Sequence, residues 1–344
     1  MKKNHKPAIL LIYTGGTIGM IKDFETGALK AFNFDQLLER IPELHLLDCT
    51  IDTFSFDNPI DSSDMNPNHW VTIAEVIETH YNSFDGFVVL HGSDTMSYSA
   101  SALSFMLENL QKPVIFTGSQ LPIGDLRTDA KENLITAIQV ASLWEDNQAV
   151  IKEVCLYFEY KLYRGNRTTK ISAEHFSAFT SPNLPHLAES GVHLKVNERL
   201  LDEFYGNESF AIHKDMFANV MILKLFPGIS KYVLEAILKI ENLEGIVLET
   251  YGSGNAPTEW WFISLLQEAI SNGLHVVNVT QCSGGSVNMG QYETSTALKE
   301  IGVISGKDIT TEAAITKLMF LLGKQISKTN FKTLFETSIC GEME

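Results

Sequence analysis

Buried strand-like runs alternate with helix-like segments along this chain, and this alternation restricts the fold more than any other feature of the sequence. Runs of consecutive apolar residues typical of buried strands occur at residues 8–13, 86–91, 113–118 and 153–160. Apolar residues recur at helical spacing in residues 69–81, 97–110 and 129–144. Strands that alternate with helices favour a parallel sheet with right-handed crossovers.

The same alternation restarts after a polar, mixed stretch near residues 192–215. Strands are then predicted at residues 219–225, 244–250 and 274–280, and helices at residues 230–240, 259–273 and 311–324. The 344 residues also exceed the usual size of one hydrophobic core. We therefore predict an α/β protein with two doubly wound parallel-sheet domains: a larger one over residues 1–191, a linker over 192–215 and a smaller one over 216–344.

The charge balance restricts the partners of the protein. Acidic residues outnumber basic ones 42 to 26, which gives a net charge of −16. Nucleic acids and anionic membranes are bound through basic patches, so neither is expected as a partner. A small anionic substrate remains compatible, because a local site can be positive in an acidic protein.

The cysteines and the N-terminal residues indicate the compartment. Four scattered cysteines (Cys49, Cys155, Cys282 and Cys340) form no pattern with metal-ligand spacing, so we predict free thiols and no metal site. The first apolar run, residues 8–13, is shorter than the ~7–15 residues of a signal-peptide core. No stretch approaches the ~18–20 apolar residues of a membrane span. We therefore expect an unprocessed cytoplasmic protein.

Two turns that follow predicted strands combine glycine with hydroxyl side chains. Residues 14–17 read Thr-Gly-Gly-Thr, and residues 91–95 read His-Gly-Ser-Asp-Thr. Parallel sheets place ligands at the carboxyl ends of their strands, and glycine lets the backbone approach a ligand. Backbone N–H groups in such turns favour an anion. Each turn alone could be a tight turn or a helix N-cap, but two in one sheet favour a binding site.

The hydroxyls in these turns are candidates for nucleophilic catalysis. The chain has no GxGxxG, no Gly-Lys-Ser/Thr phosphate loop and no GxSxG at these turns, so nucleotide binding and a serine-hydrolase elbow are not indicated. A hydroxyl nucleophile needs a proton acceptor. We interpret His91 as structural and consider Lys170, after the fourth strand, as the partner. An ordinary surface lysine is the alternative.

Eight motifs, in order along the chain, resemble those of the bacterial-type L-asparaginases, and most resemble the cytoplasmic type I branch. They are YTGGTIG (13–19), DSSDM (61–65), HGSDTM (91–96), TGSQLP (117–122), RGNRTTK (164–170), SPNLPHL (181–187), YGSGNAP (251–257) and TQCSGGSVNMG (280–290). The resemblance implies a flavodoxin-like N-terminal domain that carries the catalytic residues and a Rossmann-like C-terminal domain. It also implies hydrolysis of L-asparagine to L-aspartate and ammonia without a metal or organic cofactor.

The resemblance implies a catalytic role for four residues. Thr14 would attack the side-chain amide carbon of the substrate and form an acyl-enzyme. Ser93, Asp94 and Lys170 would form a second set of hydroxyl, acid and lysine. Lys170 could stay charged and orient the site, or could move a proton through Ser93.

Other residues would bind the substrate, again by resemblance. Ser62, Ser63 and Asp64 would hold its α-carboxylate and α-ammonium, and Gly15 and Gly92 would line the same pocket through their backbones. Asn255 would reach the site of a neighbouring subunit, because the family builds each site at a dimer contact. We therefore expect a homotetramer, arranged as a dimer of dimers.

The sequence departs from the family pattern at three places. Most relatives have threonine where Ser93 stands, which keeps the hydroxyl but removes a methyl group that limits its rotamers. No tyrosine lies between Tyr13 and Tyr81, although many relatives carry one on a mobile lid after the first turn. Either another group would then activate Thr14, or Lys30 or a neighbouring residue would supply the function. Glu249 stands where some relatives bind a second, activating asparagine through arginine, which disfavours activation by that route.

Several alternatives stay open beside asparagine hydrolysis. Glutamine is one methylene longer, a difference worth only ~1–3 kcal/mol, so a minor glutaminase activity is expected. The amidase-like subunit of a tRNA-dependent amidotransferase would carry an extra N-terminal domain, whereas seven residues precede the first strand here. A non-catalytic amino-acid sensor with the same fold is the main alternative, although a sensor needs no nucleophile.

Overall fold

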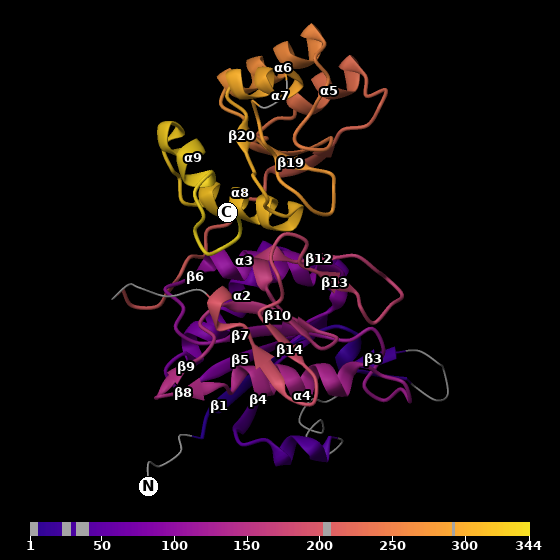
Figure 1. Cartoon of the computed structure of the whole chain (residues 1–344), viewed down its shortest axis with the longest axis vertical. Helices are drawn as coiled ribbons and strands as arrows, with labels where there is room; N and C mark the ends of the chain where they lie inside the picture. The colour runs from indigo at the N-terminus through magenta and orange to yellow at the C-terminus, as the bar shows by residue number, and fades with distance from the viewer. Residues whose placement is uncertain (1–5, 23–28, 32–40, 202–207, 291–292) are drawn as a thin grey trace. The chain divides into compact units, whose positions relative to one another are not determined.

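The computed structural model describes residues 6–22, 29–31, 41–201, 208–290 and 293–344. The chain forms two compact units, Met1–Lys214 and Asp215–Glu344 (Figure 1). Each unit contains its own sheet with helices, which confirms the predicted α/β class with parallel sheets in both domains. Within the described residues, no helix has the length and apolar character required to cross a membrane.

The first unit is built on an eight-stranded sheet in the order β15-β14-β11-β10-β7-β5-β1-β4. Five neighbouring strands are parallel: β4 (Thr50–Ile60), β1 (Ala8–Gly15), β5 (Gly86–Leu90), β7 (Val114–Thr117) and β10 (Val154–Phe158). Three antiparallel strands extend it: β11 (Lys161–Arg164), β14 (Ala188–Ser190) and β15 (Leu194–Val196). The four strands predicted in this half of the chain are all present.

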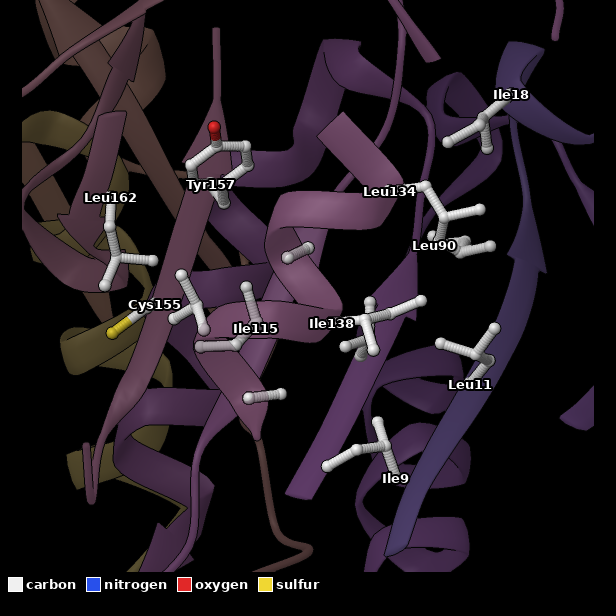
Figure 2. Packing of buried hydrophobic residues seen from close by; sticks show 14 of the residues in the cluster. Ile9, Leu11, Ile18, Leu90, Ile115, Leu134, Ile138, Cys155, Tyr157 and Leu162 are labelled. Atoms are coloured by element: carbon white, nitrogen blue, oxygen red, sulfur yellow. The ribbon is translucent and has the colours of Figure 1, made fainter. Parts of the chain in front are cut away.

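Helices cover both faces of this sheet. Leu134 and Ile138 of α4 (Ala130–Ala141) pack against Ile9, Leu11 and Leu90 on one face (Figure 2). The helices α2 (Pro67–His80) and α3 (Met96–Met106) lie on the opposite face (Figure 1). Strands covered on both sides have to be apolar at every position, which is why they read as continuous hydrophobic runs.

Short strands complete the first unit. They are β2 (Met20–Lys22) with β3 (Leu29–Ala31), β8 (Trp144–Glu145) with β9 (Gln148–Ala149), β12 (Thr169–Lys170) with β13 (Phe179–Thr180), and β6 (Leu107–Glu108) with β16 (Ala211–Ile212). Many relatives carry a lid tyrosine after the first turn, and most of the corresponding segment here, residues 23–28 and 32–40, lies outside the described residues.

The structure differs from the predicted linker of residues 192–215. In this segment Leu194–Val196 pairs with β14 and Ala211–Ile212 pairs with β6, so both stretches belong to the first unit. The boundary between the units falls after Lys214. Two- and three-residue strands at a sheet edge bury little surface, and their mixed composition therefore resembled that of a linker.

The second unit has a four-stranded parallel sheet in chain order: β17 (Val220–Lys224), β18 (Gly245–Thr250), β19 (His275–Thr280) and β20 (Ile304–Ser305). Its helices are α5 (Lys231–Leu238), α6 (Trp260–Ser271), α7 (Glu293–Glu300), α8 (Thr311–Gly323) and α9 (Lys328–Phe335). Leu234 and Phe262 of α5 and α6 share a core cluster with Ile246 of β18. The three strands and three helices predicted here are present.

Candidate active site

The two glycine-rich turns meet at the carboxyl ends of adjacent strands. Tyr13 of β1 pairs with Leu90 of β5, so the turn after Tyr13 lies beside the turn after Leu90. Gly16, with φ +86°, approaches the other turn so closely that a Cβ on it would lie 2.5 Å from Gly92 Cα. Such contact between backbones requires glycine. The sequence pattern therefore marks a place where two turns touch.

A third segment lies against the place where the two turns meet, which we call the corner of the site. Gly15, with φ +138°, lies against the end of β4, where an added Cβ would be 2.1 Å from Ile60 O. A Cβ on Gly92 would lie 2.5 Å from the Oγ of Ser62, the first residue of the short helix η4 (Ser62–Asp64). The predicted residues Gly15, Gly92 and Ser62 thus lie together, contributed by three different strand ends.

Thr14 is buried at the end of β1, with 1% of its surface exposed. Its Oγ1 donates a hydrogen bond of 2.9 Å to the carbonyl oxygen of Leu90. The hydroxyl proton of Thr14 therefore points to the end of the neighbouring strand β5.

Tyr13, which directly precedes Thr14, is unsuited to act as its base. The phenol Oη donates 3.2 Å to the carbonyl oxygen of Gly19, and the ring packs against that glycine. Burial raises the pKa of Tyr13 to about 12. A phenol in this setting keeps its proton at neutral pH.

Ser93, Asp94 and Lys170 are brought together as one cluster. Ser93 and Asp94 begin the short helix η5 (Ser93–Thr95) after β5, and Lys170 ends β12. Lys170 Nζ lies 2.8 Å from Ser93 Oγ and 2.7 Å from Asp94 Oδ1. The lysine side chain is 16% exposed and that of Asp94 is 67% exposed, so the cluster faces solvent on one side. Lys170 is therefore not an ordinary surface lysine.

Gln120 belongs to this cluster, although sequence reasoning did not select it. Ser93 Oγ donates 3.1 Å to Gln120 Oε1, and Gln120 Nε2 donates 3.1 Å to the carbonyl oxygen of His175. The carboxylate of Asp129 accepts hydrogen bonds from the backbone N–H of Gln120 at 3.0 and 3.1 Å. Gln120 stands just after β7, the next strand in the sheet, and that position was the signal that could have found it.

The segment Ser62–Asp64 is tied to the second turn. Thr95 Oγ1 donates 2.7 Å to the carbonyl oxygen of Ser62, whose side chain is buried. The hydroxyl of Ser63 instead donates 2.9 Å to Asp61 Oδ1. Hydrogen bonds from the backbone and then the hydroxyl of Ser63 lower the pKa of Asp61. Ser62 thus faces the corner, while Ser63 and Asp64 are exposed.

Asn255 lies in the second unit, in a tight turn at the carboxyl end of β18. Its backbone N–H and C=O both bond to Tyr251, at 2.8 and 2.9 Å. Asn278 Nδ2 of β19 donates 3.2 Å to Gly254 O and fixes the turn. Within the described residues, no group of three or more His, Cys, Asp or Glu side chains is arranged to hold a metal ion.

Comparison with known families decides the classification. The family described as "Asparaginase, N-terminal" matches residues 8–202, and "Glutaminase/Asparaginase C-terminal domain" matches residues 219–335. The chain belongs to the asparaginase family. Its two compact units correspond to the two domains that this family defines.

Individual relatives agree with this membership over the whole chain. L-asparaginase 1 of Escherichia coli (strain K12) is 43% identical over 339 residues, which cover 98% of each protein. The crystal structure of L-asparaginase I from Vibrio cholerae superposes with a TM-score of 0.90 at 41% identity, covering 99% of this chain and all of that one. The thermostable L-asparaginase from Thermococcus kodakarensis superposes with a TM-score of 0.89 at 33% identity, covering 98% of this chain and 99% of that one.

Proposed function

We propose that this protein is a cytoplasmic L-asparaginase that hydrolyses L-asparagine to L-aspartate and ammonia with Thr14 as the nucleophile. The observation that carries the proposal is the contact of the Lys170 ammonium with both Ser93 Oγ and the Asp94 carboxylate, at 2.8 and 2.7 Å. Membership of the asparaginase family supports the substrate and the reaction class. A sensor would need no nucleophile.

The substrate would bind as a zwitterion. Ser62 Oγ and the backbone N–H groups of the two turns suit its α-carboxylate, because hydroxyls and turn N–H groups donate to anions. The carboxylates of Asp64 and Asp94 suit its α-ammonium. Gly15 and Gly92 let the backbone come within reach of such a small ligand.

The chemical step needs one proton transfer for each half-reaction. Thr14 Oγ1 attacks the amide carbon, a C–O bond forms, the C–N bond breaks and the threonine proton passes to the leaving nitrogen, which departs as ammonia. Water then cleaves the ester, returns a proton to Thr14 and releases aspartate. Lys170 donates to both Ser93 and Asp94, and in this proposal it orients the two side chains.

The decisive experiment measures ammonia and aspartate release from asparagine. Thr14→Ala should lose at least ~10³-fold in kcat, as covalent catalysts do when the nucleophile is removed, while still binding aspartate. The matched variant Thr14→Ser keeps the hydroxyl and should retain much more activity. If Thr14→Ala turns over like the wild type, the nucleophile lies elsewhere. A wild type that binds asparagine without releasing ammonia would be a sensor.

Glutamine is a second substrate to test in the same assay. A single extra methylene is worth only ~1–3 kcal/mol of discrimination, so a minor glutaminase activity is expected. The ratio of kcat/KM for the two amides measures it directly.

We also propose that the protein is a homotetramer, a dimer of dimers, in which Asn255 completes the site of a neighbouring subunit. The resemblance of the YGSGNAP turn to that of the family supports this proposal, and light scattering tests the oligomer. A complementation assay tests Asn255: Thr14→Ala and Asn255→Ala subunits, each inactive alone, should regain activity when mixed after dissociation. No recovery in verified mixed oligomers would place Asn255 in the site of its own subunit.

A further inference from the structure

A chain of buried polar groups runs beneath the second turn. His91, directly after β5, is completely buried. Its Nδ1 lies 2.7 Å from the carbonyl oxygen of Gly92, and its Nε2 lies 2.9 Å from Ser99 Oγ on α3. Trp70 Nε1 on α2 donates 2.9 Å to the same Ser99 oxygen. Three elements of the first unit are thereby connected to one peptide of the turn.

The donors and acceptors among these hydrogen-bonded groups permit only one arrangement of protons. A carbonyl oxygen only accepts, so His91 Nδ1 must carry the proton. Burial lowers the pKa of His91 to about 4, so the ring is neutral and its Nε2 accepts from the Ser99 hydroxyl. The indole N–H only donates, and it supplies the second bond of Ser99 Oγ. Every group in the chain is satisfied, and the tautomer of His91 is fixed.

The bond to Gly92 O fixes the direction of the next N–H group. In a trans peptide, the C=O and the following N–H point in opposite directions. With Gly92 O turned to the buried ring, the N–H of Ser93 points away from it. Ser93 is the first residue of η5, so its N–H has no partner inside that helix, and none occurs among the other described residues.

We infer that His91 is a positioning residue: as the Nδ1–H tautomer it holds the Gly92–Ser93 peptide so that the Ser93 N–H stabilises the negative oxygen formed when Thr14 attacks. This inference rests on the proposed function. Preorganised backbone N–H groups are strong contributors to acyl transfer because they need no reorientation during the reaction. His91 itself does not touch the substrate, since both ring nitrogens are occupied inside the core.

Two amide variants separate this role from space filling. The side-chain nitrogen of asparagine can take the position of Nδ1, whereas that of glutamine reaches toward Nε2. His91→Asn should keep the bond to Gly92 O and retain kcat to within ~10-fold. His91→Gln should lose it and reduce kcat ~10²–10³-fold, the usual effect of removing one oxyanion donor, with KM changed less than ~3-fold. Equal kcat values for the two variants would overturn the inference.

A second test uses the wild-type protein and therefore does not depend on whether a variant folds. Long-range ¹H–¹⁵N spectra of protein labelled at histidine should show His91 protonated at Nδ1 and not at Nε2 between pH 5 and 8. An Nε2–H tautomer would overturn the inference. Trp70→Phe serves as the control, because it removes the distant donor only and should lower thermal stability while kcat stays within ~2-fold.

The inference and the proposed function can fail separately. An active Thr14→Ala enzyme contradicts the nucleophile but leaves the tautomer of His91 and the peptide orientation intact. An inactive Thr14→Ala enzyme together with a fully active His91→Gln enzyme contradicts the role of His91 alone.

Discussion

Lys170 in the first unit and Lys317 in the second unit both bind a carboxylate, but in opposite surroundings. Lys170 is partly exposed, and it contacts Asp94 and the hydroxyl of Ser93. Lys317 of α8 is completely buried with Glu342, and it also donates 2.7 Å to each of the carbonyl oxygens of Phe335 and Thr337. A buried charge with every direction satisfied is structural, whereas an exposed pair that includes a hydroxyl can still meet a ligand.

The largest effect is expected from Lys170→Met. Removing the ammonium that holds Ser93 and Asp94 should reduce kcat by ~10³-fold or more, as removal of one member of a cooperating catalytic set does. The melting temperature should change little, because exposed pairs contribute at most ~1 kcal/mol. Steady-state ammonia release and thermal unfolding of the same preparation check both statements. A stable variant with full activity would show that Lys170 has no part in catalysis.

Lys317→Met should have the opposite effects: a large loss of stability and little change in kcat. It leaves the carboxylate of Glu342 buried without its partner, which typically costs ~3–5 kcal/mol of unfolding free energy. Urea unfolding at pH 7 measures this cost. The double variant with Glu342→Gln should recover part of the loss, because no unpaired charge then remains. If Lys317→Met is as stable as the wild type, burial is not what distinguishes the two lysines.

His91 extends the comparison to a buried group that must stay neutral. Its pKa falls to about 4 in the folded protein from an ordinary value of 6.5, because burial disfavours the charged ring. The unfolded state therefore binds more protons between these values, and the stability present above pH 6.5 is lost as the pH falls toward 4. At pH 5 the loss from this group is about 2 kcal/mol. Unfolding of the wild type and His91→Asn at pH 7 and 5 should show a smaller pH dependence in the variant.

The smallest effect concerns a third lysine–carboxylate pair. Glu249 accepts a 2.7 Å hydrogen bond from Thr311 Oγ1 and lies 3.6 Å from the exposed Lys224 Nζ. A carboxylate at this place repels the carboxylate of a second asparagine molecule. The rate should therefore follow a hyperbolic curve against asparagine concentration, with a Hill coefficient near 1. A sigmoidal curve would mean that an effector binds despite Glu249.

The sequence predicts best those parts of the fold in which a single physical cause determines the pattern of residues. Strand β1 is buried along its length because helices cover both faces of the sheet, so residues 8–13 could form little else. Strand β4 was missed because it is the edge of the sheet and most of its residues are partly or fully exposed. Edge strands tolerate polar residues, and their sequences resemble loops.

The residues of the candidate site also divide into those that the sequence predicts and those that it does not. Residues in glycine-rich turns were found because the glycines mark close backbone contact, as at Gly16. Gln120 was not found, because an amide has no characteristic spacing in sequence and only its position after β7 indicated it. Ser63 was selected for the substrate, but its hydroxyl is held by Asp61, a local contact that competes with any ligand.

The close contacts of three glycines in the candidate site have a consequence for engineering. Gly15, Gly16 and Gly92 leave no room for even one methyl group, since each would place a carbon within about 2.5 Å of another main-chain or side-chain atom. Mutational libraries at these positions should yield almost only misfolded protein. Altered selectivity between amides should be sought in neighbouring side chains, with Ser62, Ser93 and Gln120 as the first positions to randomise.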